Sequence, residues 1–230
     1  MNLKKLESKI GIEFRDHSFY EEALTHRSYL NEHPRWPHGN NERLEFLGDA
    51  VLELAVTEGI YRRLPKEEEG KLTVFRAALV NTKALAAAAR EIGLDKMLLL
   101  SKGEAKDVNS KGRESISANA VEALIGAIYL DRGFEITRGF IERHIISNLE
   151  TIVDQGGKDA KSLVQEYAQA QFKITPAYEV LEESGPAHER RFRVGLLIGE
   201  KLKSEGVGAS KQEAELDAAE KLLRKLGLTG

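Results

Sequence analysis

The feature that most constrains this chain is a change of hydrophobic pattern around residues 154–159, DQGGKD. Before this segment, apolar residues recur with helical spacing and no stretch alternates as a strand does. After it, the pattern predicts a helix, three extended runs and a second helix. The glycine pair and polar residues of the segment are typical of a linker. The sequence therefore predicts two domains, 1–152 and 158–228, joined by a linker at 153–157.

The first domain is predicted to be all-α. Apolar spacing, breaks and caps place its helices at 2–10, 17–29, 41–64, 67–90, 115–130 and 134–151. Pro65 ends the third of these helices, and the prolines and glycine of 31–40 indicate a loop. Residues 101–114, SKGEAKDVNSKGRE, are polar and rich in lysine, so we expect a mobile connection there.

The second domain is predicted to be α+β, in the order α-β-β-β-α. Its helices are expected at 160–171 and 210–226 and its strands at 177–183, 189–198 and 201–206. From Lys158 onward, basic and acidic residues are equal in number, 12 of each, so the acid excess of the chain belongs to the first domain.

Composition and charge exclude several classes of protein. With 41% hydrophobic and 31% charged residues, the chain is typical of a soluble globular protein. The absence of cysteine excludes disulfides, thiolate zinc sites and cysteine nucleophiles. No apolar run has the length of a signal peptide or a bilayer span, so we expect a cytoplasmic protein without a membrane. A net charge of -3 excludes a global basic field, so any nucleic-acid contact must be local.

A stripe of acids lies on the predicted helix that begins with NERLEFLGDAVL. At the helical repeat, Glu42, Glu45 and Asp49 fall within a stripe about 60° wide. Beside this stripe, the pattern predicts a buried face made of Leu44, Phe46, Leu47, Ala50, Val51 and Leu54. Clustered carboxylates repel one another, which favours a shared cation near them.

A second helix carries a related signal, because Glu122 is the one charged residue of 116–130 and Asn119 lies one turn before it. A buried carboxylate is costly unless it is protonated, ion-paired or bound to a cation. Glu69 in the KEEEG segment adds an acid from a third element. Oxygen ligands without cysteine suit Mg²⁺. The residues alone leave two alternatives open, a metal site and an acidic face in contact with water.

Several motifs of the chain resemble those of one enzyme family. Bacterial ribonuclease III has a catalytic domain similar to four segments here: LTHRSY at 24–29, NERLEFLGDAVL at 41–52, EEEG at 67–70 and RESISANAVEALIGAIYLD at 113–131. Residues 159–227, with GPAH and SKQEAELDAAEKLL, are similar to the double-stranded-RNA-binding domain that follows in that family. The resemblance covers nearly the whole chain in the same order. NERLEFLGDAVL is specific to the nuclease, whereas the tail motif is specific only to the RNA-binding module.

The resemblance implies an endoribonuclease that cuts both strands of double-stranded RNA as a homodimer. Its cofactor would be Mg²⁺, for which Mn²⁺ can substitute, and its products 5'-phosphate and 3'-hydroxyl ends in rRNA, mRNA and tRNA processing. By position, the residues expected to bind the metal are Glu45, Asp49, Asn119 and Glu122. Those expected in catalysis are Asp49, Glu122, Glu42 and Glu69.

One position departs from the pattern of the family. Asn119 stands where many members carry an aspartate, and an amide oxygen lacks the charge of a carboxylate. An alternative function is therefore a non-cleaving, regulatory protein that binds double-stranded RNA. A helical bundle that binds iron is another alternative, but such sites use Glu-x-x-His pairs, which the helical acids here lack.

The tail offers groups for an RNA duplex, whose shallow minor groove displays 2'-hydroxyls between rows of phosphates. The residues expected to bind RNA are Gln165, Glu166, Gly185, Pro186, His188, Ser210 and Lys211. The first two offer hydrogen bonds from a helix, the next three form a protruding loop, and the last two begin a helix whose free N–H groups favour phosphate. Taken singly, each is more typical of an ordinary surface, but together in one α-β-β-β-α arrangement they favour RNA binding.

Overall fold

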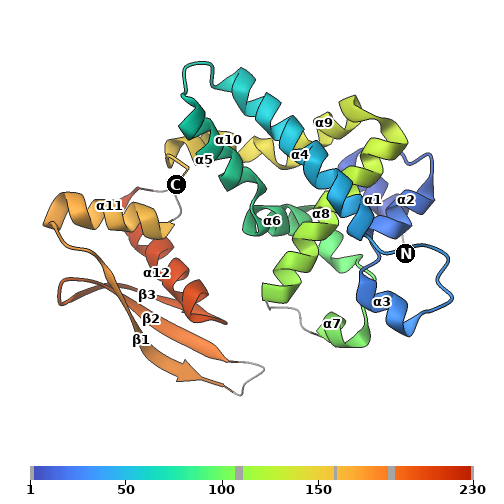
Figure 1. Cartoon of the computed structure of the whole chain (residues 1–230). Coiled ribbons are helices and arrows are strands. Elements are labelled where there is room, and N and C mark those ends of the chain that lie inside the picture. Colours follow the sequence, from blue (N-terminus) through green and yellow to red (C-terminus); the bar gives the residue numbers. More distant parts are fainter. Residues whose placement is uncertain (1–2, 107–110, 158–159, 186–189, 229–230) are drawn as a thin grey trace. The chain divides into compact units, whose positions relative to one another are not determined.

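The computed structural model describes the chain except residues 1–2, 107–110, 158–159, 186–189 and 229–230. The chain divides into two compact units, Met1–Asp154 and Gln155–Gly230 (Figure 1). Among the described residues, the first unit is built from helices, and the second combines helices with one three-stranded sheet. This confirms the predicted fold class, an all-α part followed by an α+β part.

The helices of the first unit surround one core. α8 (Lys111–Arg132) passes through this core, and Val121, Leu124, Ile125 and Ile128 on it are fully buried. The other described helices are α1 (Leu3–Ile10), α2 (His17–Ala23), α3 (Arg27–Glu32), α4 (Glu42–Arg63), α5 (Glu69–Val80), α6 (Thr82–Ile92), α7 (Lys102–Lys106), α9 (Phe134–His144) and α10 (Leu149–Asp154), with short 3-10 turns η1 (Leu94–Lys96) and η2 (Ile146–Asn148).

The predicted single helix over 17–29 is wrong, because the chain forms α2 and α3 with a break between them. At the break Thr25 forms a parallel bridge with Leu99. His26 then caps α3, since its Nδ1 accepts a hydrogen bond from the Ser28 N–H at 3.3 Å. A contact between segments far apart in the sequence thus overrides the local helical pattern.

Two further predicted helices are also broken. Asn81 separates α5 from α6, which are bent by 45° relative to each other, and its side chain caps α6 by accepting from the Ala84 N–H at 2.9 Å. The predicted helix over 134–151 becomes α9, η2 and α10, because the chain turns at 145–149 to bury three aliphatic side chains. α10 includes residues 153 and 154, which the sequence assigned to the linker.

The segment predicted as a mobile connection over 101–114 is partly helical. Residues 107–110 lie outside the described part of the chain, but α7 precedes them and α8 begins at 111 rather than 115. α7 is attached to α3, because the Ser101 N–H donates to Ser28 Oγ at 3.1 Å and the Lys102 N–H donates to the Glu32 carboxylate at 3.2 Å.

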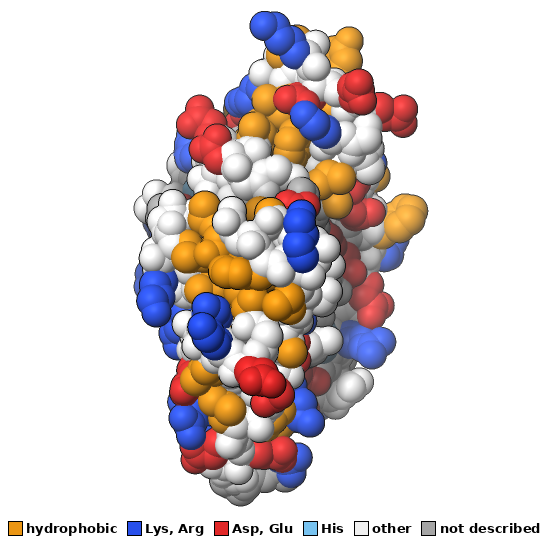
Figure 2. All heavy atoms as spheres, turned by 90° about the vertical axis from the view of Figure 1, so that its left-hand side faces the viewer, with side chains coloured by type: hydrophobic (Ala, Val, Ile, Leu, Met, Phe, Trp, Pro, Cys, Tyr) orange, Lys and Arg blue, Asp and Glu red, His pale blue; other side chains and the backbone are white. Residues whose placement is uncertain are grey.

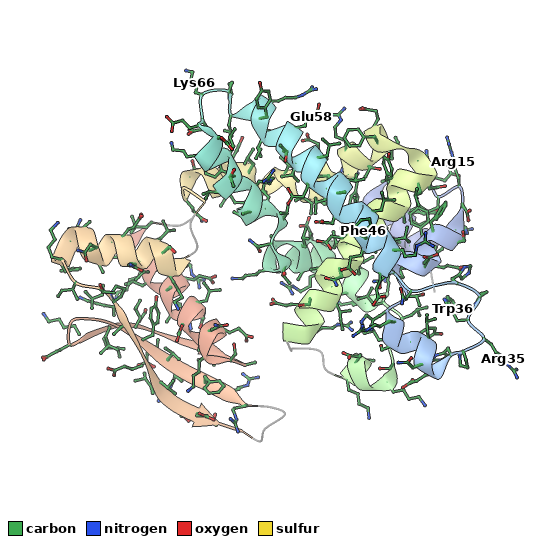
Figure 3. All side chains as sticks on the ribbon, in the orientation of Figure 1. Arg15, Arg35, Trp36, Phe46, Glu58 and Lys66 are labelled. Atoms are coloured by element: carbon green, nitrogen blue, oxygen red, sulfur yellow. The ribbon has the colours of Figure 1, made fainter. Side chains whose placement is uncertain are left out.

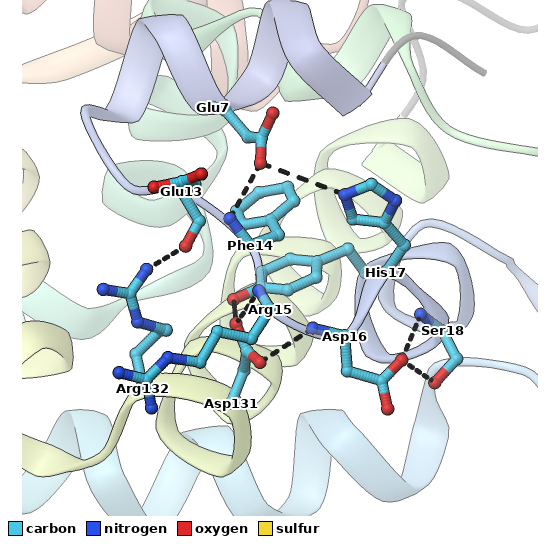
Figure 4. A network of polar contacts seen from close by, with 10 residues as sticks. Glu7, Glu13, Phe14, Arg15, Asp16, His17, Ser18, Asp131 and Arg132 are labelled. Carbon is cyan, nitrogen blue, oxygen red and sulfur yellow. Dashed lines mark hydrogen bonds and ion pairs between the residues drawn. The ribbon is translucent and has the colours of Figure 1, made fainter.

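A polar network ties the C-terminal end of α8 to the segment between α1 and α2 (Figure 4). The Asp131 carboxylate accepts hydrogen bonds from the backbone N–H groups of Arg15 and Asp16, both at 3.0 Å, and from the Tyr20 hydroxyl at 2.9 Å. Burial, followed by the bond to Asp131, raises the pKa of Tyr20 above its ordinary range, so the hydroxyl stays a donor. Arg132 donates to the Glu13 carbonyl. The network holds α8 in place at one end.

The second unit packs two helices on one face of an antiparallel sheet ordered β1-β2-β3. Its elements are α11 (Ala160–Phe172), β1 (Ala177–Ser184), β2 (Arg191–Ile198), β3 (Lys201–Gly208) and α12 (Lys211–Leu226). The predicted α-β-β-β-α order is confirmed. A Cβ at Gly206 would lie 2.0 Å from the Ala214 carbonyl oxygen, so only glycine lets β3 pack this closely on α12.

Among the described residues, no single helix is long and apolar enough to cross a membrane. The bent pair α5 and α6 passes the same test of length and composition only when both helices are counted together.

Candidate active site and nucleic-acid interface

The first candidate site lies where α4 and α8 cross (Figure 1). A Cβ added to Gly48 on α4 would lie 1.7 Å from the Glu122 carbonyl oxygen, and one added to Gly126 on α8 would lie 2.3 Å from the Leu44 carbonyl oxygen. Both distances are impossible for real Cβ atoms, so the two helix backbones touch at these glycines. The polar side chains next to the crossing are therefore brought together from both helices.

Three acids and an amide converge at this crossing. Burial, and then repulsion by Asp49 and Glu45, raises the pKa of Glu122 to about 7. Burial also raises the pKa of Glu45, with smaller contributions from Glu42 and Asp49, while a hydrogen bond from the side chain of Asn119 opposes this shift. The contact of the two helix backbones places Glu45 and Asp49 of α4 near Glu122 of α8, so their charges act on one another and positive charge would be stabilised at the crossing.

Asn119 is directly involved in this group, because its side chain hydrogen-bonds to the Glu45 carboxylate. An amide N–H donated to a carboxylate favours the ionised form. The amide therefore links α8 to α4 in a way that an ionised aspartate, which only accepts hydrogen bonds, would not.

Glu42 lies at the rim of the group. It is exposed at the first turn of α4, where its backbone N–H donates to Asn40 Oδ1 at 3.1 Å and its carboxylate lies 3.6 Å from the Arg27 guanidinium. Its charge still contributes to the raised pKa of Glu45. Glu42 is thus placed to act at the edge of the site.

Glu69 is not brought to the same place. α4 has 22 residues and is about 33 Å long, and Glu69 begins α5 beyond the end of α4 that is remote from Glu45 (Figure 1). The prediction that it joins the other acids is therefore wrong for a single chain. The sequence already places EEEG after the C-terminal end of the predicted helix 41–64, whereas Glu45 lies near its N-terminal end, so this separation follows from the length of the helix.

The buried face of α4 also differs from the prediction. The side packed against the core carries small and aliphatic residues, namely Leu44, Gly48, Val51, Leu52, Ala55, Val56, Gly59 and Ile60. Phe46 and Leu54 are 83% and 59% exposed, and Ala50 is exposed as well. The predicted face is thus wrong for these three residues. The close crossing with α8 selects the small side, and a second apolar stripe stays on the surface, where Figure 3 labels Phe46.

The donors at the crossing fit a hard divalent cation by their chemistry. They offer carboxylate and amide oxygens from two helices in backbone contact, the ligand type that Mg²⁺ prefers. As the side chains stand, however, no three His, Asp or Glu residues within the described ranges form a group that could hold a metal ion. Glu45, Asp49, Asn119 and Glu122 are the residues that would hold one.

The second candidate site lies on α11, α12 and the end of β1. Gln165 and Glu166 are exposed on α11. Ser210 caps α12, since its Oγ accepts from the Glu213 N–H at 3.2 Å, and Lys211 is exposed beside it with Nζ 5.9 Å from the ring centre of Phe192. Gly185 is exposed after β1 with φ of 90°, a left-handed conformation that favours glycine. Pro186 and His188 lie outside the described residues.

Basic side chains do not form a continuous field on the face shown in Figure 2, where Lys and Arg alternate with Asp and Glu. On the sheet, Arg193 on β2 is bound by two acids, with N–O distances of 3.0 Å to Glu182 and to Glu205. On the helices, Lys161 contacts Glu215 at 2.6 Å. Positive charge is therefore local and partly neutralised, as the net charge of the sequence predicts.

Sequence reasoning missed the glycines of the crossing and the ion pair of the two tail helices. The signal for Gly48 and Gly126 was present, because a glycine inside a strongly helical pattern is costly and often marks close packing. No comparable signal marks the Lys161–Glu215 pair, since its partners lie 54 residues apart.

Comparison with known proteins finds a family match for each of the two units. Residues 16–149 match the Ribonuclease-III-like family, and residues 160–226 match the double-stranded RNA binding motif. Ribonuclease 3 of Leptospira interrogans is 42% identical over 226 residues, which are 98% of this chain and 91% of that protein. Ribonuclease 3 of Carboxydothermus hydrogenoformans is 44% identical over 226 residues, covering 98% of this chain and 96% of that protein.

A solved structure agrees with these matches. The nuclease domain of ribonuclease III from Campylobacter jejuni, described for flexibility in a region involved in dimer formation, is 42% identical and superposes with a TM-score of 0.57. The match covers 64% of this chain and 98% of that domain. The acids at the α4–α8 crossing lie within the matched family region, and the exposed residues of α11 and α12 lie within the RNA-binding motif. The chain therefore belongs to the ribonuclease III family and is an endoribonuclease of double-stranded RNA.

Proposed function

We propose that this chain hydrolyses double-stranded RNA with Mg²⁺, or Mn²⁺ in its place, held at the α4–α8 crossing. The acids that α4 and α8 bring to this crossing carry this proposal, because burial first, and then the charges of Asp49 and Glu45, raise the pKa of Glu122 to about 7. A group of carboxylates that repel one another is stabilised when a divalent cation neutralises part of their negative charge. When bound, the ion would lower the pKa of a water molecule and neutralise charge on the phosphate.

Each residue of the site would have a role that follows from its position. Glu45 and Asp49 on α4 would hold the cation from one side, and Glu122 with the amide oxygen of Asn119 from the other. Glu42 at the rim would bind either the leaving group of the scissile phosphate or the attacking water. The Arg27 guanidinium lies beside it. Water attacks phosphorus and the bond to the 3' oxygen breaks, which leaves a 5'-phosphate and, after protonation, a 3'-hydroxyl.

The second unit would hold the duplex. Gln165 and Glu166 offer hydrogen bonds to 2'-hydroxyls, and Lys211 with the N-terminus of α12 offers positive charge to phosphate. None of these contacts reads bases. Selection of rRNA, mRNA and tRNA precursors would therefore depend on duplex shape. Cleavage would take place in the cytoplasm.

We also propose a homodimer through the first unit. Phe46 and Leu54 form an apolar stripe along α4 that the chain leaves exposed, and one protomer alone does not bring Glu69 to the acids. A stripe of this kind is costly in water and is typical of an interface between copies. The Campylobacter jejuni nuclease domain, in which a flexible region is involved in dimer formation, supports this choice.

A cleavage assay tests the proposed activity. The full chain is mixed with end-labelled duplex or single-stranded RNA and with Mg²⁺, Mn²⁺ or EDTA, and the ends of the products are analysed. We expect duplex cleavage with either ion and none with EDTA. Glu122→Gln should abolish cleavage and leave duplex binding unchanged, because it removes a charge that faces the cation rather than RNA. Cleavage by this variant at millimolar Mg²⁺ would show that the site is misassigned.

The same assay separates the enzyme from a binding protein that has lost catalysis through Asn119. Retained gel shift with no shortening of the duplex in Mg²⁺ or Mn²⁺ would favour the binding protein. Asn119→Asp then gives a direct comparison: a large gain in rate indicates a weakened site, whereas little change means that asparagine is an accepted ligand.

A further inference from the structure

An ion pair connects the two helices of the second unit at their N-terminal ends. Lys161 Nζ on α11 lies 2.6 Å from Glu215 Oε2 on α12, and the same ammonium lies 4.8 Å from the ring centre of Tyr178 on β1. The two side chains are 41% and 24% exposed, so the pair is accessible to water and to a ligand. Lys161 is thus held in one place by an acid and by an aromatic ring.

The pair lies on the same helix faces as the proposed RNA contacts. Glu215 follows Lys211 by one helical turn and Lys161 precedes Gln165 by one turn, so each partner shares a helix face with a proposed RNA contact. A duplex bound at those contacts would bring phosphates close to the ion pair. An acid at such a position opposes a polyanion twice, because it repels phosphate and neutralises a lysine.

We infer that Glu215 limits the affinity of this chain for duplex RNA by keeping Lys161 in the ion pair, an inference that rests on the proposed function of the tail. Lys161 is therefore a potential phosphate contact that Glu215 largely suppresses. The ring of Tyr178 keeps the ammonium oriented when the acid is neutralised, so the lysine stays available at the surface. A bound duplex then dissociates more readily than it would from the same chain without the Glu215 charge.

The test compares the full chain with its Glu215→Gln variant, which removes the charge and keeps a hydrogen-bonding side chain. Affinity for a labelled duplex longer than the roughly 16 base pairs that one such domain spans is measured in EDTA, where no cleavage occurs, from low to high salt. We expect the variant to bind about 3- to 10-fold tighter and to lose affinity more steeply with salt, by about one counterion.

Glu179→Gln is the matched control. Glu179 is exposed on β1 opposite Gly195, so the control changes net charge by the same amount on the side of the sheet away from the helices. An equal gain in both variants would be a net-charge effect and would overturn the inference, as would a Glu215→Gln chain that binds no better than the parent.

Lys161→Gln provides a second, independent reading. Removal of the lysine from the parent leaves Glu215 without its partner and should weaken binding, whereas its removal together with Glu215 should erase the gain of Glu215→Gln, because the acid and the freed lysine are then both absent. A double variant that keeps the full gain would mean that loss of the acid raises affinity without Lys161, and the inference would fall. If the parent chain binds no duplex at all, the proposed function fails instead, which separates the two ideas.

Discussion

The two candidate sites of this chain are built in opposite ways. The acids at the α4–α8 crossing depend on backbone contact at Gly48 and Gly126, and the protonation of Glu122 depends on burial. The tail contacts depend on exposed side chains such as Lys211, whose environment is set by a helix cap. The comparison teaches that catalysis here should respond to packing and pH, whereas RNA binding should respond to salt and surface charge.

The largest effect should come from Gly48→Ala, which tests whether packing alone fixes the acid site. The added Cβ would lie 1.7 Å from the Glu122 carbonyl oxygen, so the two helices must move apart. We expect the free energy of unfolding to fall by about 3 kcal/mol and cleavage to be lost even at temperatures where the chain stays folded. Thermal denaturation and the duplex cleavage assay measure both.

Gly70→Ala is the matched control for this variant. Gly70 also lies inside a helix, near the start of α5, but a Cβ there meets no atom within 4 Å. Alanine should leave cleavage unchanged and stabilise the chain by up to about 1 kcal/mol, because it lowers the entropy of the unfolded state. Equal behaviour of the two variants would refute the role given to the crossing.

A smaller effect is expected from Phe46→Ser, which tests whether the exposed stripe of α4 joins two copies. Phe46 is 83% exposed, so the substitution should leave the fold of one protomer intact. We expect dimerisation to weaken by about 2 kcal/mol, or about 30-fold, measured by light scattering over a range of concentrations. Phe172→Ser on α11 removes another exposed phenylalanine and should leave the dimer unaffected. A monomeric parent chain would exclude this interface altogether.

The exposure of Phe46, which the pattern predicted to be buried, shows what the sequence could and could not predict. The periodicity of 41–64 was strong enough to predict α4, and the isolated charge of Glu122 was enough to single out α8. The pattern could not choose between two apolar stripes on α4, because side-chain hydropathy is the same whether a residue meets its own core or another copy. Gly48 and Gly126 make that choice, since only the small face permits backbone contact.

Long-range contacts account for the other differences. The break between α2 and α3 follows from the pairing of Thr25 with Leu99, two residues that no local pattern connects. The site shows the same division. Glu42, Glu45 and Asp49 could be grouped because they share one helix, and the length of that helix already separates Glu69 from them within one chain. Spacing along a helix could thus be predicted, whereas the pairing of distant segments, such as Thr25 with Leu99, could not.

A further prediction concerns pH and the metal-free chain. The pKa of Glu122 is about 7 in the fold against an ordinary 4.5, so the folded state binds a proton more readily than the unfolded state. Stability from this group is therefore unaffected below pH 4.5, falls as pH rises toward 7 and stays low above it. Glu122→Gln should remove this penalty, although we expect it to abolish cleavage as well.

We therefore expect Glu122→Gln in EDTA to be more stable than the parent by about 1 kcal/mol at pH 8, a value reduced for partial exposure, and equal to it near pH 4.5. Denaturant titrations at the two pH values measure the difference. Glu179→Gln, on an exposed strand, should show no such pH dependence. A Glu122→Gln chain that is less stable than the parent at pH 8 would mean that the ionised carboxylate makes favourable contacts in the fold.

The smallest effect is expected in the tail, where Lys211→Ala tests whether binding depends on local charge. Lys211 is exposed at the N-terminus of α12, so its loss should leave stability almost unchanged and weaken duplex binding about 3- to 5-fold, with a salt dependence lower by about one counterion. Cleavage at saturating RNA should be unaffected. Lys225→Ala, in the last turn of the same helix, removes equal charge and should bind as the parent does. If both variants lose affinity equally, RNA responds to the overall charge of the tail and not to the face of α12 that begins at Ser210.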